Sequence, residues 1–387
     1  MDFRLSAEQE QIRHSVREIL TDFPGEYWQK LDRELGYPEE FIEALTKGGW
    51  LAALIPEEYG GSGLGVLEAS LILEEINRSP GNGGVCHAQM YIMGTLLRHG
   101  SNEQKKKFLP PIAAGELRLQ AFGVTEPTTG SDTTKLQTFA RRDGDRYIVN
   151  GQKVWISRAE HSDLMLLLVR TTPADEVDKK TEGLSVLLVD LREAIGHGIT
   201  VKPIRAMMNH HSCELFIDDL EVPVENRVGE EGQGFRYILD GMNAERILIA
   251  AECIGDARFF LTRASDYAKD REVFGRPIGQ NQGIQFPLAR AHAHTEAADL
   301  VRFRAADAFD RGEACGADAN IAKLLAADAS WEAGNAALQT LGGFGFAAEY
   351  DIERKLRETR LYQVAPISTN LILTYVAERV LGLPRSY

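Results

Sequence analysis

Glu245 is a carboxylate on an otherwise apolar stripe of a predicted helix over residues 241–251. Residues three and four positions away share its helical face, and they include Met242, Leu248 and Ile249. Desolvation on such a face disfavours the anion and raises the pKa of a carboxylate toward the range of a useful general base. The chemistry indicated is proton abstraction.

Asn243 and Arg246, three residues apart, form a polar edge beside Glu245. This edge would suit a polar ligand next to the base. The alternative is an internal ion pair that only positions the helix.

A second group of candidates lies in the irregular stretch 121–132, where hydroxyls, glycines and backbone donors occur together. Such a segment can hydrogen-bond a polar ring or a phosphate, and the alternative is an ordinary Pro-Gly loop. Further along, Trp155-Ile156-Ser157 offers an aromatic face beside a hydroxyl at the end of a strand. That combination suits a flat heterocycle.

Composition limits the possible functions. A chain of 387 residues with 44% hydrophobic residues buries a large core and exceeds one typical domain. The net charge of -14 argues against nucleic acid or an anionic membrane as a partner. Residues 1–20 lack the apolar core of a signal peptide, and no apolar run is long enough to span a membrane.

The four cysteines are far apart, which favours neither a zinc site nor a disulfide framework. They are Cys86, Cys213, Cys253 and Cys315. We therefore expect a reducing, cytoplasmic location.

Helices are expected at the amino-terminal end of the chain. Ser6 and Gln9 form a capping-box pattern before a helically spaced apolar run. Residues 55–63 read as a loop by their Gly, Pro and Ser content. Further helices are predicted over 39–47, 66–78, 90–98 and 103–108.

The hydrophobic period changes near Leu119. Residues 147–149 and 153–156 are β-rich runs around Asn150-Gly151, which predicts a hairpin. Short apolar runs at 164–169, 184–189 and 214–217 without helices between them indicate an antiparallel barrel or sandwich. From Phe235 onward the pattern is helical again. The predicted domains are 1–118 (helical), 119–230 (β) and 231–387 (helical).

A doubly wound dinucleotide fold is disfavoured, because no glycine fingerprint follows a predicted strand. The nearest match, Gly343-Phe344-Gly345 with Ala348, follows a helical run. We interpret Gly342 and Gly343 as a helix stop.

Four ordered motifs resemble those of the acyl-CoA dehydrogenase family, and the resemblance covers nearly the whole chain. The motifs are Thr125-Glu126-Pro127 through Gly130-Ser131-Asp132, Asn150 through Ser157, Arg271 through Ile278 with Gln282, and Gln339 through Gly343. The resemblance implies an α+β fold with an amino-terminal helical domain, a central antiparallel β-barrel domain and a carboxy-terminal four-helix bundle. It also implies FAD bound by the β domain and the bundle, in a homotetramer.

The family pattern assigns roles to individual positions. Phe122, Val124, Thr125, Trp155 and Ser157 would hold the flavin ring, and Arg271, Phe274, Gln282, Gln339 and Gly343 would reach the FAD of a neighbouring subunit. Ser131, Asn243 and Arg246 would contact the CoA part of the substrate.

Some of these residues also have a physical reading of their own. Arg271 offers a planar fork to a pyrophosphate, and its alternative is a solvated charge. Ser368 and Asn370 begin a helix whose free amides form a cofactor anion site, and the alternative is that Ser368 only caps the helix. His292 and His294 face different ways on a helix, so we expect no metal there.

One departure from the family pattern decides the expected base. Many members carry a catalytic glutamate shortly before the last helix, where this chain has Pro366. A minority, including enzymes that resemble isovaleryl-CoA and long-chain acyl-CoA dehydrogenases, place it immediately before an arginine of another helix. Glu245-Arg246 matches that arrangement. The family's thioester-binding amide is also absent at Pro366, and Ile367 or another backbone amide would substitute.

The expected reaction is abstraction of the α-proton by Glu245 and transfer of the β-hydride to FAD, giving a trans-2-enoyl-CoA. An electron-transferring flavoprotein would accept the electrons. Two alternatives are an enoyl-CoA reductase or related acyl-CoA-processing enzyme, and a non-catalytic scaffold on the same fold. The acyl chain stays open, with Met90, Tyr91 and Met93 as candidate pocket residues.

Overall fold

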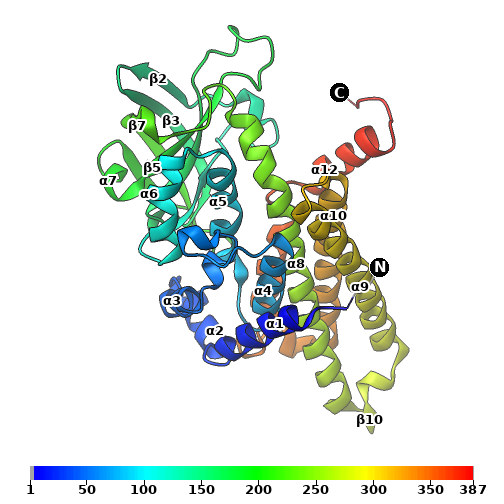
Figure 1. The fold of residues 1–387 in the computed structure, drawn as a ribbon. Coiled ribbons are helices and arrows are strands. Elements are labelled where there is room, and N and C mark those ends of the chain that lie inside the picture. Colours follow the sequence, from blue (N-terminus) through cyan, green and yellow to red (C-terminus); the bar gives the residue numbers. More distant parts are fainter. Residues whose placement is uncertain (1–3, 387) are drawn as a thin grey trace. The chain divides into compact units, whose positions relative to one another are not determined.

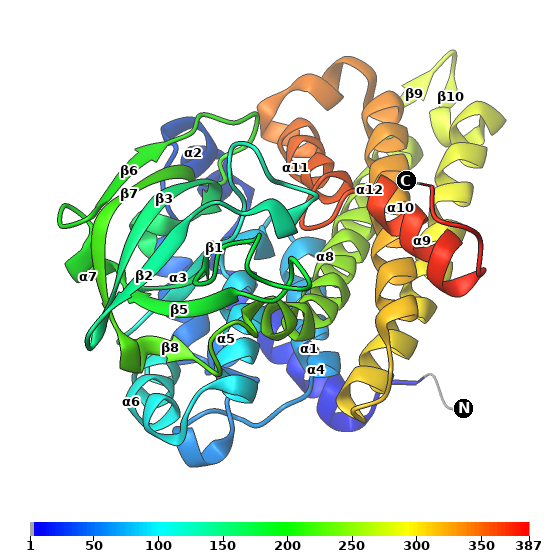
Figure 2. The same cartoon turned by 90° about the horizontal axis from the view of Figure 1, so that it is seen from above.

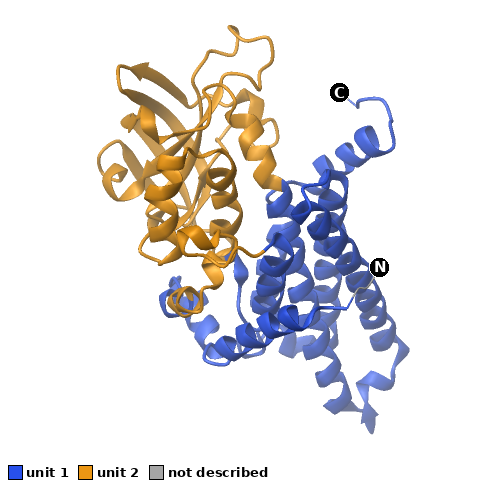
Figure 3. Ribbon diagram, in the orientation of Figure 1, with its two compact units in different colours: residues 1–41, 65–84, 243–387 blue, residues 42–64, 85–242 orange. Residues whose placement is uncertain are grey.

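The computed structural model describes residues 4–386, which fall into two compact units (Figures 1 and 3). Unit 1 comprises residues 1–41, 65–84 and 243–387, and unit 2 comprises residues 42–64 and 85–242. Residues within each unit contact one another more than they contact residues of the other unit. The three-domain boundaries expected at 118 and 230 stay a prediction.

The amino-terminal helices arise where the sequence analysis expects them, with one addition. Ser6 Oγ accepts from the Gln9 amide at 3.1 Å and Gln9 Oε1 accepts from the Ser6 amide at 3.0 Å, which confirms the capping box. The additional helix, α2, has a single buried residue, Trp28. The helices are α1 (Ala7–Leu20), α2 (Gly25–Glu34), α3 (Glu39–Lys47), α4 (Val66–Arg78), α5 (His87–His99) and α6 (Asn102–Ala113).

Unit 2 contains an eight-stranded sheet in the order β6-β7-β3-β2-β4-β5-β8, with β1 paired to β4. Its strands are β1 (Leu119–Gly123), β2 (Phe139–Asp143), β3 (Arg146–Ser157), β4 (Leu164–Arg170), β5 (Leu184–Asp190), β6 (Ile199–Pro203), β7 (Ser212–Pro223) and β8 (Arg227–Val228), with the short helix α7 (Leu191–Ala194) before β6. The described edge strands β6 and β8 do not pair, so a closed barrel is not confirmed. The β1–β4 and β2–β4 pairs are parallel, so the sheet is not wholly antiparallel.

Strand β4 explains why the sheet is buried on both faces. Its alternate residues Leu164, Leu166 and Leu168 join the core beneath α5 and α6, whereas Met165 and Leu167 join the second core on the other face. Helix α5 packs along β1 on the first of these faces (Figure 2).

The predicted hairpin at Asn150-Gly151 is wrong. Both residues lie inside β3, at a register shift between Val149 and Gly151 where β3 pairs with β7. Asn150 Nδ2 donates to Asp219 Oδ1, and Asn150 Oδ1 accepts from the Asp219 backbone amide, both at 2.9 Å. A Cβ on Gly151 would lie 2.5 Å from Thr138 Oγ1. The Asn-Gly pair therefore permits close strand approach, and the β2–β3 turn lies at residues 143–146 instead.

Three long helices dominate the carboxy-terminal part of the chain. They are α8 (Gly234–Asp270), α9 (Gln282–Asp310) and α10 (Gly316–Leu341), followed by α11 (Ile352–Thr359) and α12 (Thr369–Tyr375), with the hairpin β9 (Glu272–Val273) and β10 (Arg276–Pro277) between α8 and α9. Arg258 of α8 donates to Asp299 of α9 at 2.7 Å. Gly342 follows α10 with φ 59°, which confirms the predicted helix stop.

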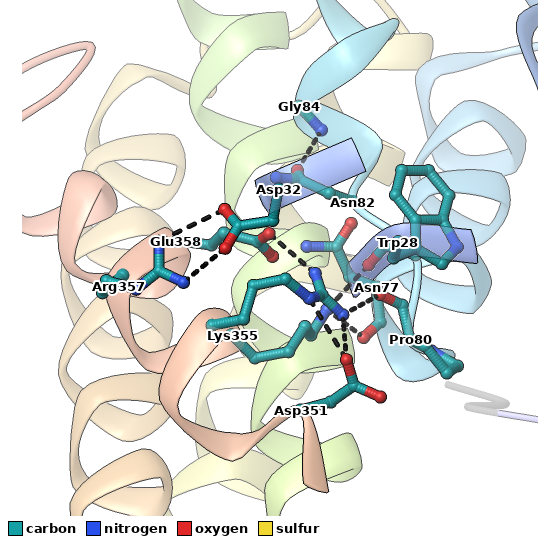
Figure 4. Close-up of polar contacts among 12 residues, drawn as sticks. Trp28, Asp32, Asn77, Pro80, Asn82, Gly84, Asp351, Lys355, Arg357 and Glu358 are labelled. Atoms are coloured by element: carbon teal, nitrogen blue, oxygen red, sulfur yellow. Dashed lines mark hydrogen bonds and ion pairs between the residues drawn. The ribbon is translucent and has the colours of Figure 1, made fainter. Parts of the chain in front are cut away.

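A network of buried ions joins α8, α11 and the end of α4 inside unit 1. Figure 4 shows Lys355 and Asp351 beside Asn77 and Pro80. Lys355 Nζ lies 2.5 Å from Asp256 Oδ1, and both side chains are fully buried. Lys355 also donates to the carbonyls of Asn77 and Gly81 at 2.9 and 2.8 Å. Burial raises the pKa of Asp256 to about 6 although the Lys355 charge opposes this shift.

Replacing Lys355 tests this network. Lys355→Met leaves the buried Asp256 carboxyl without its counter-ion, with only the Asn77 side-chain amide as a donor, and it removes the Lys355 donor from two buried carbonyls. It should cost about 3–5 kcal/mol of folding free energy. Lys269→Met is the control, because Lys269 pairs with Asp266 on the surface and should change stability by less than about 1 kcal/mol. The measurement is the thermal unfolding midpoint of each variant. An equal fall of the midpoint in both variants would contradict the prediction.

Candidate functional site

In unit 1, Glu245 lies on α8 and is 5% exposed, so it is a buried carboxylate as the apolar stripe predicts. Next to it, Arg246 Nη1 donates to Asn243 Oδ1 at 2.9 Å, which confirms contact along the predicted polar edge. Arg246 Nε is buried and has no hydrogen-bond partner among residues 4–386. Burial lowers the pKa of Arg246, while the charge of Glu245 opposes that shift. A buried donor left over in this way fits a ligand oxygen.

Lys323 of α10 is a buried cation that the sequence analysis missed. Its Nζ donates to the carbonyl of Ile367 at 2.9 Å and to that of Tyr362, so it fixes the loop that contains Pro366. Burial lowers the pKa of Lys323 to about 8, and the nearby charge of Glu245 is among those that oppose the shift. The sequence signal that could have identified it is a single lysine in the alanine-rich run 319–329.

The candidates expected to serve a neighbouring subunit gather at the opposite end of the helical bundle. Phe274 and Gly275 form the two-residue turn of the β9–β10 hairpin with φ 54° and 76°. Phe274 is fully exposed, and its left-handed backbone is strained for an aromatic residue. The Tyr267 ring contacts that of Phe344, which places the turn after α10 beside this hairpin end. Arg271, Gln282, Gln339 and Gly343 are exposed there.

Distance along α8 separates these residues from Glu245. Glu245 and Asp270 lie 25 residues apart on one continuous helix, or roughly 38 Å at about 1.5 Å per residue. Within one chain, the Arg271 group and Glu245 therefore cannot contact the same small ligand group.

Ser368 caps α12, since its Oγ accepts from the Leu371 amide at 3.4 Å. Asn370 lies exposed in the first turn of this helix. The capping interpretation is therefore observed, and a cofactor role for either residue stays a prediction.

In unit 2, an internal ion pair fixes the segment that follows β1. Lys153 Nζ lies 3.0 Å from Glu126 Oε1 and donates to the Val124 carbonyl at 3.1 Å. Glu126 in turn accepts from the amides of Gln137 and Thr138 at 2.7 and 2.8 Å. Burial lowers the pKa of Lys153 to about 8. The cofactor candidates on this segment are therefore held by a satisfied buried pair.

The other candidates of this segment differ in exposure. Phe122 and Val124 are partly buried and pack against the core beneath α5, and Thr125 accepts from the Val154 amide at 2.9 Å through its carbonyl. Thr129 Oγ1 is buried, and the described part of the chain supplies no partner for it. Ser131 is exposed.

The end of β3 is irregular where the sequence analysis places an aromatic face and a hydroxyl. Trp155 lies at a register shift between Lys153 and Ile156, has φ 61° and is 57% exposed. Ser157 Oγ lies 3.0 Å from His210 Nε2, and Arg158 Nη2 lies 3.2 Å from His210 Nδ1. His210, which precedes β7 by two residues, was not among the residues expected at the site, because no local sequence pattern marks it.

Among residues 4–386, neither a metal cluster nor a membrane-spanning helix is found. Residues 4–386 hold no group of three or more His, Cys, Asp or Glu side chains that could bind a metal ion. His294 instead lies 2.6 Å from Glu332. Among the described helices, none is long and apolar enough to cross a membrane.

Comparison with known proteins gives matches along the whole chain. Models for the N-terminal, middle and C-terminal domains of acyl-CoA dehydrogenase match residues 6–116, 121–220 and 232–381. Acyl-CoA dehydrogenase fadE12 of Mycobacterium bovis is 37% identical over 385 residues, covering 99% of this chain and 98% of the relative.

Solved structures agree with these matches. A glutaryl-coenzyme A dehydrogenase in complex with glutaryl-CoA aligns with a TM-score of 0.93 at 32% identity, covering 100% of this chain and 98% of that one. The structure described as PigA with FAD and proline aligns with a TM-score of 0.91 at 28% identity, covering 99% and 100%.

The Lys153–Glu126 pair yields a test of the unit-2 segment that needs no ligand. Lys153→Met leaves Glu126 buried without its counter-ion, so the amides of Gln137 and Thr138 should exchange with deuterium at least about tenfold faster. Lys135→Met, at a surface lysine paired with Asp132, is the matched control. Unchanged protection in Lys153→Met would show that the pair does not hold the segment.

Proposed function

The chain belongs to the acyl-CoA dehydrogenase family, and from this premise we propose that it catalyses FAD-dependent α,β-dehydrogenation of an acyl-CoA thioester to the trans-2-enoyl-CoA. The observation that carries the proposal is the burial of Glu245 beside Arg246 in a chain whose other base position holds Pro366. Proline cannot accept a proton, so Glu245 is the base that this sequence offers.

The residues fit the cofactor and the substrate. Trp155 exposes an aromatic face, and Thr129 Oγ1 is a buried hydroxyl without a partner in residues 4–386. These features support a flavin contact by Phe122, Val124, Thr125, Trp155 and Ser157. FAD, when bound, supplies the acceptor for the hydride that leaves the β-carbon.

Glu245 would remove the proton from the α-carbon. Its low exposure keeps water away, and water would otherwise solvate and weaken the base. Arg246 has one unused buried donor, and with Asn243 and Ser131 it would bind the CoA portion of the substrate. The donor that polarises the thioester in place of an amide at Pro366 stays a prediction.

Lys323 would support this chemistry from behind the Pro366 loop. It fixes the carbonyls of Tyr362 and Ile367, so the loop keeps one conformation next to the substrate position that the proposal assigns. The nearby negative charge of Glu245 in turn opposes the lowering of the Lys323 pKa, so the charged form of Lys323 is favoured beside Glu245.

Assembly into a homotetramer is part of the proposal. The exposed set of Arg271, Phe274, Gln282, Gln339 and Gly343 is too far along α8 to serve the flavin that works with Glu245 of the same chain. We infer that it contacts the FAD of a neighbour, with Ser368 and Asn370 as further cofactor candidates.

The remaining proposals concern context. An electron-transferring flavoprotein would take up the electrons. The described cysteines are all free and buried, which supports a cytoplasmic location. Met90 and Met93 are buried on α5 and Tyr91 is partly buried, so Tyr91 is the most accessible of the three acyl-pocket candidates.

Glu245→Gln tests the base. It keeps the size of the side chain but removes its capacity to accept a proton, so flavin reduction should slow by at least about 100-fold while acyl-CoA binding survives. Anaerobic stopped-flow absorbance with a panel of acyl-CoA esters measures both quantities and identifies the acyl preference.

Glu358→Gln is the control for this experiment. Glu358 is also a buried carboxylate, and it accepts from Arg354 at 2.7 Å in the ion network of α11. Near-normal reduction in Glu245→Gln together with a collapse in Glu358→Gln would refute the assignment. If no saturated acyl-CoA reduces the FAD of the wild-type protein, the result would favour the reductase or the scaffold alternative.

Arg271→Ala tests the shared cofactor. If Arg271 binds the FAD of a neighbour, its loss should weaken FAD retention roughly tenfold and shift the oligomer toward smaller species at the same time. Light scattering coupled to absorbance at the flavin band reports both quantities. Arg276→Ala on the same hairpin is the control, and full FAD retention by a monomer would reject the assignment.

A further inference from the structure

His210 contacts both a proposed flavin ligand and a buried cation. On one side, its Nε2 lies 3.0 Å from Ser157 Oγ, and on the other its Nδ1 lies 3.2 Å from Arg158 Nη2. Arg158 is 1% exposed. Arg158, His210 and Ser157 therefore form a short series of hydrogen-bonded side chains that ends at the Ser157 hydroxyl.

The donor and the acceptor in each of these two hydrogen bonds follow from the chemistry of the side chains. A guanidinium can only donate, so His210 Nδ1 must accept and carry no proton. A neutral imidazole then has its proton on Nε2, which donates to Ser157 Oγ. Burial, followed by the charge of Arg158, lowers the pKa of His210 well below its usual value, so the ring stays neutral near pH 7. His87 and His211 face it as well and act in the same direction.

We propose that His210 is a positioning residue that fixes the direction of the Ser157 hydroxyl, so that Ser157 donates its proton to an acceptor atom of the flavin ring. Because Ser157 Oγ accepts from His210, its own hydrogen must point elsewhere. Within residues 4–386 the hydroxyl has no other hydrogen-bond partner. This inference rests on the proposed FAD-dependent function.

Backbone hydrogen bonds near Ser157, Arg158 and His210 hold these three side chains in place. Ser157 pairs with Ser212 in the β3–β7 ladder, and the Arg158 amide donates to the His211 carbonyl at 2.8 Å. Arg158 and His211 both have left-handed backbones, with φ 56° and 50°. Strain of this kind persists only where the surroundings fix it, and it concentrates at functional sites.

Two variants of His210 separate a role through Ser157 from a general structural role. His210→Gln offers an amide N–H near the Nε2 position and can still donate to Ser157. His210→Asn places its carbonyl near the Nδ1 position, so Arg158 keeps an acceptor while Ser157 loses its donor. We expect FAD to bind roughly three- to tenfold more weakly in His210→Asn and near-normally in His210→Gln.

Ser157→Ala completes a double-mutant cycle. If His210 acts through Ser157, His210→Asn should have no further effect in the Ser157→Ala background. Fluorescence titration of the apoprotein with FAD and the visible absorption spectrum of the bound flavin give readouts independent of turnover. The spectrum should shift in Ser157→Ala and His210→Asn alike.

The outcomes are distinguishable. Additive losses in the double variant, or equal losses in His210→Gln and His210→Asn, would overturn the inference while FAD binding by the wild type preserves the proposed function. A wild-type protein that binds no FAD would instead remove the proposed function itself.

Discussion

Burial of carboxylates on α8, of which Asp256 is paired with Lys355 of α11, is the constraint on which unit 1 depends. Glu245, Glu252 and Asp256 follow one another at spacings of seven and four, so they share one stripe of the helix, and each is at most 5% exposed. Asp256 lies in direct contact with Lys355, whereas Lys323 donates to two loop carbonyls and reaches Glu245 through charge. The same helix thus carries a carboxylate used for stability and another one proposed for chemistry.

Unit 2 solves a different problem, which is to hold an aromatic face and a hydroxyl at the end of a strand. Trp155 and Arg158 have left-handed backbones although neither is glycine, and the ladder between β3 and β7 shifts register there. Strands β3 and β7 are twelve residues long each, so regular pairing continues on either side of the shift. This regular pairing stabilises the local irregularity. Lys153, buried two residues before Trp155, holds Glu126 and so links the strand to the segment after β1.

Much of the fold and part of the site followed from the sequence because their signals are local. The Ser6–Gln9 capping box and the apolar stripe around Glu245 depend on residues three and four apart, and both are observed. The Asn150-Gly151 prediction failed because a strong turn signal was outweighed by pairing with strands on both sides. Lys323 and His210 escaped notice for a related reason, since their partners are 39 to 53 residues away in the chain. Contacts over that range leave no periodic pattern.

The length of α8 leads to one further conclusion about how the proposed enzyme is organised. A rigid helix places Glu245 roughly 38 Å from the hairpin end, and the hairpin tip exposes Phe274 completely in a strained conformation. A lone chain gains nothing from an aromatic residue held in this way, because exposed apolar surface is unfavourable in water. Burial against another subunit or its cofactor would recover that free energy. If so, FAD binding and subunit association are linked equilibria, and each one strengthens the other by the same factor.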